Sequence, residues 1–217
     1  MKLSKNTLDH LKHFSTINPN FLFKKGAEQS TIAGSKGRIV AATLDTSFPL
    51  DFPIRDLGIF LKAVSSLNDP DIEFTKSKLT LRGKDGKIYF KKSDPKNLVL
   101  PSKKITFPET DIEFDIGRDH FSTLINSLKK HHFYDVNFKG DGKAIVIKTN
   151  GSHREDYVFE QTIGKTDKKF SYRFVVSNLI CPIDDYKVSI SRKGIARFQS
   201  KSSDYISYIA VEKPKPQ

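Results

Sequence analysis

The sequence predicts an α+β protein of two similar domains, each an antiparallel sheet with two helices on one face. Three observations predict this fold class. Helical spacing of apolar residues occurs in few stretches, most of the remainder alternates as strands do, and the order of these elements repeats along the chain. The length of 217 residues suits two domains of about 100 residues each.

Three stretches have the apolar spacing of an amphipathic helix: residues 7–17, 54–68 and 117–132. In each, an apolar residue recurs every three or four positions, and polar residues fill the opposite side. The apolar positions are Leu8, Leu11 and Phe14, then Leu57, Phe60, Leu61, Val64 and Leu67, then Phe121, Leu124, Ile125 and Leu128.

Strands separated by tight polar turns account for nearly everything else. The turns GKDG (83–86) and GDGK (140–143) offer the glycines that short hairpins need at positive φ. The predicted strand regions are residues 21–26, 38–44, 71–92, 134–151 and 186–212.

The element order of the first half recurs in the second half. A strand end, a cation and an amphipathic helix occur at the start of each half, and an acidic turn followed by hairpins occurs near each end. The second half has only a weakly patterned stretch, 175–180, where the first half has its helix over 54–68. Between the halves lies SDPKNLVLPSKKITFPET, which contains prolines and has no helical period. We therefore predict domains over 1–94 and 109–217, joined by a connector over 95–108.

The chain is strongly basic, with 37 Lys and Arg against 25 Asp and Glu and a net charge of +12. Such a balance favours a polyanionic partner. Cys181 is the single cysteine, which excludes an internal disulfide and any multi-cysteine metal site. No apolar run is long enough to span a membrane, and the N-terminus is too polar for a secretory signal. A reducing, cytoplasm-like compartment is expected.

No catalytic or metal-binding motif is recognisable. The adjacent His131 and His132 would point about 100° apart on a helix, which does not suit one metal ion. Cations and histidines at a helix C-terminus, opposite the negative end of the helix dipole, are the better interpretation of SLKKHHF. The glycine loops do not match a phosphate-binding loop. We predict no enzyme activity, no cofactor and no metal.

Cations on the sides of the predicted helices that face away from the core are the candidate functional groups. Solvated helix faces would explain them one helix at a time, but repetition on three helices favours one electropositive surface that contacts phosphates without reading bases. These residues are Lys5, Lys12, Arg55, Lys62, Arg118, Lys129 and Lys130. A basic nucleic-acid-binding module without a ring, acting in transcription or repair, would use the same cations. An enzyme with an unrecognised site is a third alternative.

Several segments resemble the sliding clamps of T4-type bacteriophages, the processivity factors of DNA polymerases. The N-terminal MKLSKNTLDHLKHFSTIN carries the resemblance most specifically, and IRDLGIFLKAVSSLNDPDIEF, SDPKNLVLPSKKITFP and YKVSISRKGIARF support it in the same order along the chain. The resemblance implies the DNA clamp fold and a head-to-tail closed ring of three identical subunits, with helices around the hole. It also implies duplex DNA, the replicative polymerase, an ATP-dependent clamp loader and late-transcription factors as partners, in the cytoplasm of an infected bacterium.

Two further sites are implied by the resemblance alone. Clamps bind hydrophobic peptides of their partners near the connector and the C-terminus. The matching positions here are Leu98, Val99, Leu100, Ile209 and Val211. Clamp subunits join through edge strands, for which residues 87–92 and 156–161 are the candidates. The interface residues within them are Lys87, Ile88, Tyr89, Phe90, Tyr157, Val158 and Phe159.

One departure from the family concerns charge. Its better-known members are acidic overall with a basic channel, whereas this chain is basic throughout. Lysines also occur away from the predicted helices, and they indicate either a compositional bias or further contact with DNA outside the ring. Examples are Lys24, Lys25, Lys91, Lys92, Lys168 and Lys169.

Overall fold

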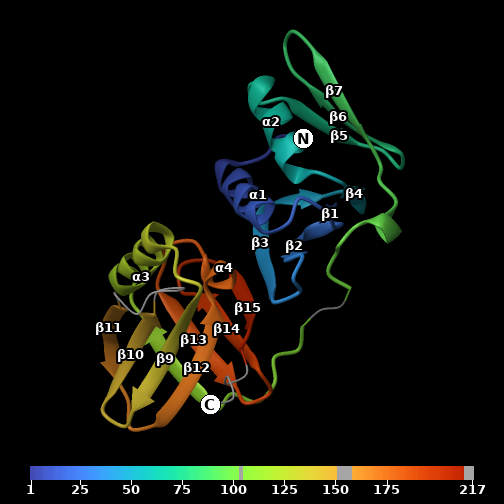
Figure 1. The fold of residues 1–217 in the computed structure, drawn as a ribbon. Coiled ribbons are helices and arrows are strands. Elements are labelled where there is room, and N and C mark those ends of the chain that lie inside the picture. Colours follow the sequence, from blue (N-terminus) through green and yellow to red (C-terminus); the bar gives the residue numbers. More distant parts are fainter. Residues whose placement is uncertain (103–104, 151–157, 213–217) are drawn as a thin grey trace. The chain divides into compact units, whose positions relative to one another are not determined.

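The computed structural model describes residues 1–102, 105–150 and 158–212, and the chain divides into two compact units (Figure 1). The units are Met1–Ile105 and Thr106–Gln217, so the division falls inside the stretch predicted as a connector. Each unit combines antiparallel strands with helices on its surface. Within the described residues, no helix is both long and apolar enough to span a membrane.

The first unit begins with a helix, and its second helix follows four strands later. Strands β1 and β4 pair with each other, β2 pairs with β3, and β5, β6 and β7 form a three-stranded sheet in that order. The elements are α1 (Lys5–Ile17), β1 (Phe21–Phe23), β2 (Gly26–Ile32), β3 (Arg38–Phe48), β4 (Phe52–Ile54), α2 (Leu57–Ser66), β5 (Asp71–Phe74), β6 (Lys78–Arg82), β7 (Lys87–Lys91) and the 3₁₀ turn η1 (Pro95–Asn97).

The second unit begins with strand β8 before its long helix α3, whereas the first unit begins directly with α1. One sheet has the strand order β11-β10-β9-β12, and β15, β14, β13 and β8 are neighbours in another. The elements are β8 (Ile112–Ile116), α3 (Arg118–His131), β9 (Asp135–Asp141), β10 (Ala144–Asn150), β11 (Val158–Lys165), β12 (Lys169–Val175), α4 (Val176–Leu179), β13 (Tyr186–Ser191), β14 (Ile195–Ser200) and β15 (Ile206–Ala210).

Phenylalanine rings build the core of the first unit. The ring of Phe23 lies 4.9 Å from Phe48, 5.1 Å from Phe60 and 5.6 Å from Phe74, as measured between centroids. These four residues come from β1, β3, α2 and β5, so one aromatic cluster holds the strands and the second helix together. Aromatic pairs at such separations stabilise beyond the burial of their area.

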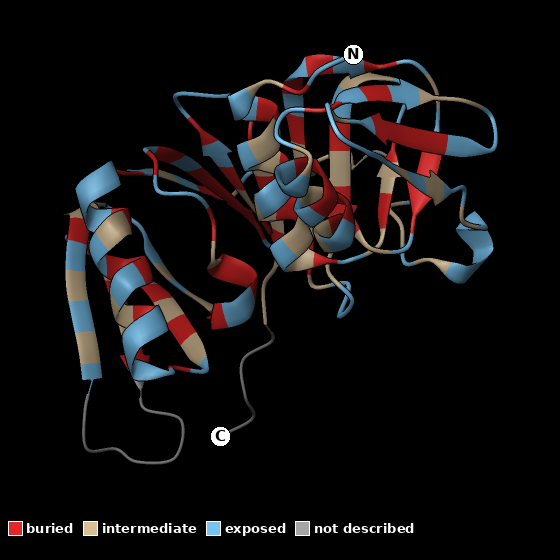
Figure 2. Cartoon of the chain, turned by 90° about the horizontal axis from the view of Figure 1, so that it is seen from above, coloured by how far each residue is buried: buried red, intermediate tan, exposed pale blue. Residues whose placement is uncertain are grey.

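The second unit has a matching aromatic core. The rings of Phe138 on β9 and Phe174 on β12 meet edge to face at 5.3 Å. On the other side, Phe121 of α3 lies 4.8 Å from Tyr186 of β13. Phe121 and Tyr186 are both fully buried, so this contact packs one face of α3 against the strands. The opposite face of α3 is exposed to solvent (Figure 2).

The structure confirms the predicted α+β class and the three amphipathic helices, and it adds detail. The weakly patterned stretch 175–180 does form a helix, the four-residue α4. The strands of each unit form more than one sheet. In the first unit Pro53 lies opposite Leu22 in the middle of β4, and a proline has no N–H to extend a ladder beyond this short pair.

One turn prediction was wrong. In GDGK, Gly142 has φ +91° as expected, but neither glycine of GKDG has a positive φ. Gly83 is needed there for a different reason, because a Cβ atom on it would lie 2.9 Å from the carbonyl oxygen of Leu67. Close approach of the β6–β7 hairpin to the end of α2 therefore accounts for this glycine.

Candidate nucleic-acid interface

Helix α1 is fixed to the strands by its N-terminal half. Ser4 caps the helix, its Oγ accepting a hydrogen bond from the Thr7 backbone N–H at 3.0 Å. The buried Thr7 hydroxyl donates to Oγ1 of Thr46 on β3, also at 3.0 Å. With this side held against β3, Lys5 and Lys12 lie on the exposed side.

Lys12 forms an ion pair with an acidic residue of its own helix. Its Nζ lies 3.1 Å from Oδ1 of Asp9, three positions earlier. Both side chains are more than half exposed, so the pair contributes little to stability and can exchange partners readily. Asp9 was not among the predicted site residues, although its position three residues before Lys12 on a helix is the signal that predicts such a pair.

Helix α2 places one predicted cation on its surface and leaves another outside the helix. Asp56 caps α2 by accepting from the Ile59 N–H at 2.8 Å, and Lys62 is exposed on the helix. Arg55 precedes the cap, so its predicted place on the helix side was wrong. It is exposed, and its carbonyl oxygen accepts from Asn20 Nδ2 at 2.8 Å.

Helices α1 and α2 lie side by side in the first unit (Figure 1). A groove of about 240 Å³ lies beside both helices. Its lining includes Leu8 and Lys12 of α1 and Leu61 of α2. Lys12 therefore borders a groove with partly apolar walls, whereas Lys5 and Lys62 are exposed on α1 and α2 and are not among its lining residues.

Helix α3 carries its cations at both ends. Gly117 precedes it without a side-chain cap, and the backbone N–H of Arg118 donates instead to Oδ1 of Asp185 at 2.8 Å. Lys129 and Lys130 occupy the last turn, where positive charge complements the helix dipole. All three cationic side chains are exposed, whereas Phe121, Leu124, Ile125 and Leu128 are buried.

The histidine pair that follows these lysines lies at the C-terminal end of α3. His131 is the last residue of α3, and its ring centroid lies 5.9 Å from that of Phe133. His132 has φ +51°, the left-handed conformation of a helix C-cap. Among the described residues, no three His, Cys, Asp or Glu side chains gather as metal ligands.

The seven predicted DNA-facing residues are all exposed, and the structure groups them by unit. In the first unit Lys5 and Lys12 lie on α1, Lys62 on α2 and Arg55 just before α2; in the second unit Arg118, Lys129 and Lys130 lie on α3. Each unit thus presents its own cationic helix face, the arrangement expected of a surface that contacts phosphates.

The predicted peptide-binding residues fall into two sets. Leu98, Val99 and Leu100 follow η1 in the first unit, where Val99 is 40% exposed. In the second unit Val211 is half-buried just after β15, and Ile209 within β15 is fully buried. The Ile209 side chain could reach a peptide only if β15 repacked, so it is the weakest member of this set.

Both predicted interface segments lie at sheet edges. Strand β7 pairs with β6 on one side, and β11 pairs with β10 on one side; within the described ranges neither has a second partner. Tyr89 and Val158 are 59% and 49% exposed, Lys87 is exposed, and Ile88, Phe90 and Phe159 are half-buried. Tyr157 lies outside the described residues.

The chain is similar along its whole length to sliding clamps of bacteriophages. It is 28% identical to the sliding clamp of Vibrio phage KVP40 over 98% of this chain and 99% of that protein. It is 26% identical to the sliding clamp of Enterobacteria phage T4, covering 98% of this chain and 97% of the relative. These relatives confirm the resemblance found in the sequence. No protein-family model matches the chain.

Several solved structures have the same fold at low sequence identity. The proliferating cellular nuclear antigen of Entamoeba histolytica superposes with a TM-score of 0.69 at 13% identity, covering 98% of each chain. A DNA polymerase III beta subunit of Eubacterium rectale gives 0.71 at 14% identity, over 100% of this chain and 66% of that one. The fold is therefore the DNA clamp fold, as predicted.

Proposed function

We propose that this chain is a sliding clamp, which encircles duplex DNA and tethers the replicative DNA polymerase so that synthesis is processive. Similarity from end to end to three phage sliding clamps is the observation that carries the proposal. The clamp fold with a cationic helix face in each unit supports it, since this is the surface that a ring would turn toward DNA.

The physical chemistry of the cationic faces suits a protein that must hold DNA and still move along it. Exposed lysine and arginine side chains attract phosphates without reading the bases, so every register on the duplex is nearly equal in energy. Tight, geometrically fixed contacts would instead halt sliding. Retention then comes from enclosing the DNA, and the cations of α1, α2 and α3 centre it in the ring.

Three subunits would close the ring head to tail. The edge of β7 on one subunit pairs with the edge of β11 on the next, a heterologous contact that closes under threefold rotation. Both edges are open in the described part of the chain, and exposed apolar side chains such as Val158 lie on them. Main-chain hydrogen bonds between edges supply the affinity.

We assign this chain no catalytic role. Its protein partners would bind to it without being chemically changed. The polymerase docks a hydrophobic peptide, for which Leu98, Val99 and Leu100 are the candidate contacts in the first unit; Val211 and Ile209 are separate candidates in the second unit. Support comes from a similar fold, the proliferating cell nuclear antigen of A. fulgidus, solved with the C-terminal region of FEN-1 bound (TM-score 0.67, 13% identity, 96% of each chain). A clamp loader and late-transcription factors are further partners, in the cytoplasm of the infected host.

Light scattering across a dilution series tests the ring. The expected mass is about three times the 24.6 kDa of the chain, falling only at low concentration. A strict monomer at high concentration would instead favour the ring-less basic module.

Charge reversal tests the DNA-facing set. The triple variant Lys5→Glu, Lys12→Glu and Lys62→Glu is expected to lose stimulation of a polymerase on primed DNA while its mass in solution stays that of the ring. The matched control reverses Lys36, Lys139 and Lys143, three exposed lysines outside the helices that belong to no proposed site, and should stimulate normally. Full stimulation by the first variant would contradict the assignment.

A further inference from the structure

The two faces of the β5–β6–β7 sheet differ in polarity: on β6 and β7 the inner face is apolar and the outer face is mostly basic. Alternate residues such as Leu79 and Leu81 are buried, and Phe90 packs on Phe60 with a centroid distance of 5.8 Å. The intervening positions point the other way, as the period of a strand requires. The outward-directed positions of β6 and β7 are Lys78, Thr80, Arg82, Lys87, Tyr89 and Lys91, of which Thr80 is buried and the other five are exposed.

Like charges face each other across this pair of strands. Lys78 is registered opposite Lys91, and Arg82 opposite Lys87. Like charges directly opposite one another in a ladder destabilise it. The positive charge of Arg82 is balanced by an ion pair with Glu73 on β5, at 3.3 Å. Within the described residues, neither Lys78 nor Lys91 forms an ion pair with a carboxylate. A bound anion would relieve the repulsion at Lys78 and Lys91.

An exposed aromatic ring lies between the two cationic pairs. Tyr89 is opposite Thr80 in the ladder, and 59% of the residue is accessible to solvent. The Nζ of Lys78 lies 6.0 Å from the centroid of its ring, within the range of a cation–π contact. A flat ring presented to solvent between lysines offers stacking and charge in the same place.

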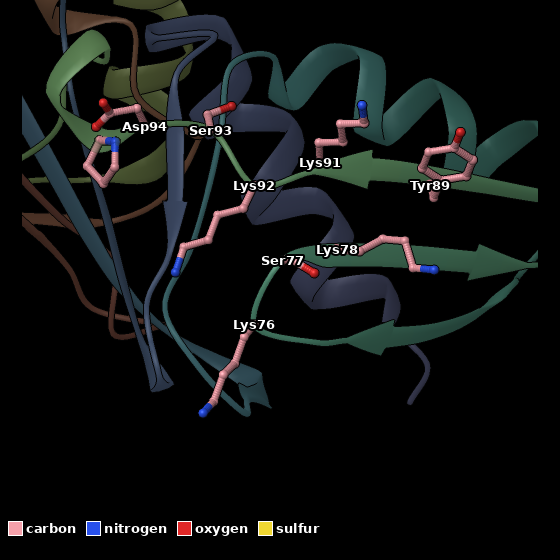
Figure 3. A pocket seen from close by; sticks show the side chains of 9 residues that line it. Lys76, Ser77, Lys78, Tyr89, Lys91, Lys92, Ser93 and Asp94 are labelled. Carbon is pink, nitrogen blue, oxygen red and sulfur yellow. The ribbon is translucent and has the colours of Figure 1, made fainter.

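A wide depression of about 740 Å³ continues this surface toward the start of the connector. Lys78, Tyr89 and Lys91 line it from the strands, and Lys76 and Lys92 from the strand ends. In Figure 3, Lys76 and Lys92 extend to the same side of the hairpin. Four lysines and one tyrosine thus surround a space with a single carboxylate, that of Asp94, on its wall.

We propose that this outer face binds single-stranded nucleic acid, with a base stacked on Tyr89 and phosphates at Lys76, Lys78, Lys91 and Lys92. Aromatic platforms among lysines are the means by which proteins bind single strands irrespective of sequence. A duplex would use the lysines but not the ring, because its bases are already stacked. An acidic peptide would likewise leave the ring unused.

This site does not include the cationic helix residues of the proposed clamp, and it shares strand β7, with Tyr89, with the proposed subunit interface. Its residues lie on β6, β7 and their flanks rather than on the helices, and pairing of the β7 edge with another strand uses main-chain groups and leaves the outer side chains open. The inference would therefore stand if the ring did not form.

Fluorescence anisotropy with a labelled oligothymidine of about 15 nucleotides tests the site. Tyr89→Ala is expected to weaken binding about tenfold, the loss of one stacked base, whereas Tyr89→Phe keeps the ring and should bind normally. Lys78→Glu with Lys91→Glu should weaken binding further and lower its salt dependence. The charge-matched control, Lys139→Glu with Lys143→Glu, alters two exposed lysines of the second unit and should have less than about a twofold effect.

Three results would overturn the proposal: normal binding by Tyr89→Ala, equal losses in the two double variants, or competition by polyglutamate as effective as that by unlabelled oligothymidine. The triple variant of Lys5, Lys12 and Lys62 is measured in parallel and should retain oligothymidine binding. Its loss of polymerase stimulation tests the clamp assignment alone, so the two proposals can fail independently.

Discussion

The side-chain amide of Asn18 donates a hydrogen bond to the carbonyl oxygen of Val99, 2.8 Å away and 81 positions along the chain. The same Nδ2 donates to the carbonyl of Ile32 at 2.9 Å, and Asn20 Oδ1 accepts from the Val99 N–H, also at 2.9 Å. Both main-chain groups of Val99 are therefore held by the loop that follows α1. These bonds fix the start of the connector, and with it the segment proposed to receive partner peptides.

Removing this amide should destabilise the first unit. Because Asn18 is 5% exposed and serves two carbonyls, Asn18→Ala is expected to cost about 1–3 kcal/mol in urea unfolding. Asn6→Ala is the matched control, since Asn6 also donates through Nδ2, to Asp45 at 2.8 Å, but is exposed. It should cost less than about 0.5 kcal/mol. Equal effects of the two substitutions would refute a structural role for the tether.

Asp184 should make the stability of the second unit depend on acid pH. Burial raises the pKa of its carboxyl group, but hydrogen bonds from the hydroxyls of Ser200 and Ser202 and from the Asp185 N–H outweigh this, and the pKa is lowered overall. When folding lowers the pKa of a carboxyl group, its ionised form stabilises the folded state at pH values above the ordinary pKa of about 3.9. This stabilisation is lost as the pH falls through the folded-state pKa.

Asp184→Asn should therefore destabilise by about 1–3 kcal/mol at pH 7, with the deficit shrinking as the wild-type carboxyl is protonated. Urea unfolding of both proteins at a series of pH values measures it. Asp204→Asn, at an exposed position two residues beyond Ser202, is the control and should change stability little at pH 7. A deficit of constant size down to acid pH would mean that the charge of Asp184 is not what stabilises the turn.

The two neighbouring histidines should respond oppositely to glycine. His132 has φ +51°, a conformation that glycine adopts without steric cost, so His132→Gly is expected to stabilise by about 0.5–1 kcal/mol. His131 is helical, and His131→Gly should destabilise by a few tenths to about 1 kcal/mol. Thermal unfolding measures both. Two changes of the same sign would show that the helix does not end at His132 in solution.

The β11 edge should control assembly. Val158→Asp places a charge on an exposed apolar position of the proposed interface, and we expect the ring to dissociate at higher concentrations than the unmodified protein does. Tyr134→Asp is the control, because Tyr134 is 63% exposed but precedes β9 rather than lying on an open edge. Sedimentation velocity compares the masses. A Val158→Asp trimer as stable as the control would exclude this edge as the joint.

Local pattern was sufficient for the helices and much less so for the sites. The stripe Phe121, Leu124, Ile125 and Leu128 predicted both the existence of α3 and its buried face, because helical period and burial are linked by geometry. Arg55 was placed on a helix side because the apolar period extends back to Ile54, whereas the Asp56 cap starts the helix later. The glycines of GKDG were assigned to a positive φ when a distant contact with Leu67 requires one of them.

The sequence by itself determined the class of this protein, its repeated organisation, its excess of positive charge and its likeness to sliding clamps, since each depends on composition or on short-range order. Only the tertiary structure decided which cations share a surface. Lys78 opposes Lys91 and flanks Tyr89 because of a strand register that the sequence does not state, and Asn18 meets Val99 because two loops far apart in the chain converge. Register and loop contacts arise from packing between distant segments, and no local pattern of residues encodes them.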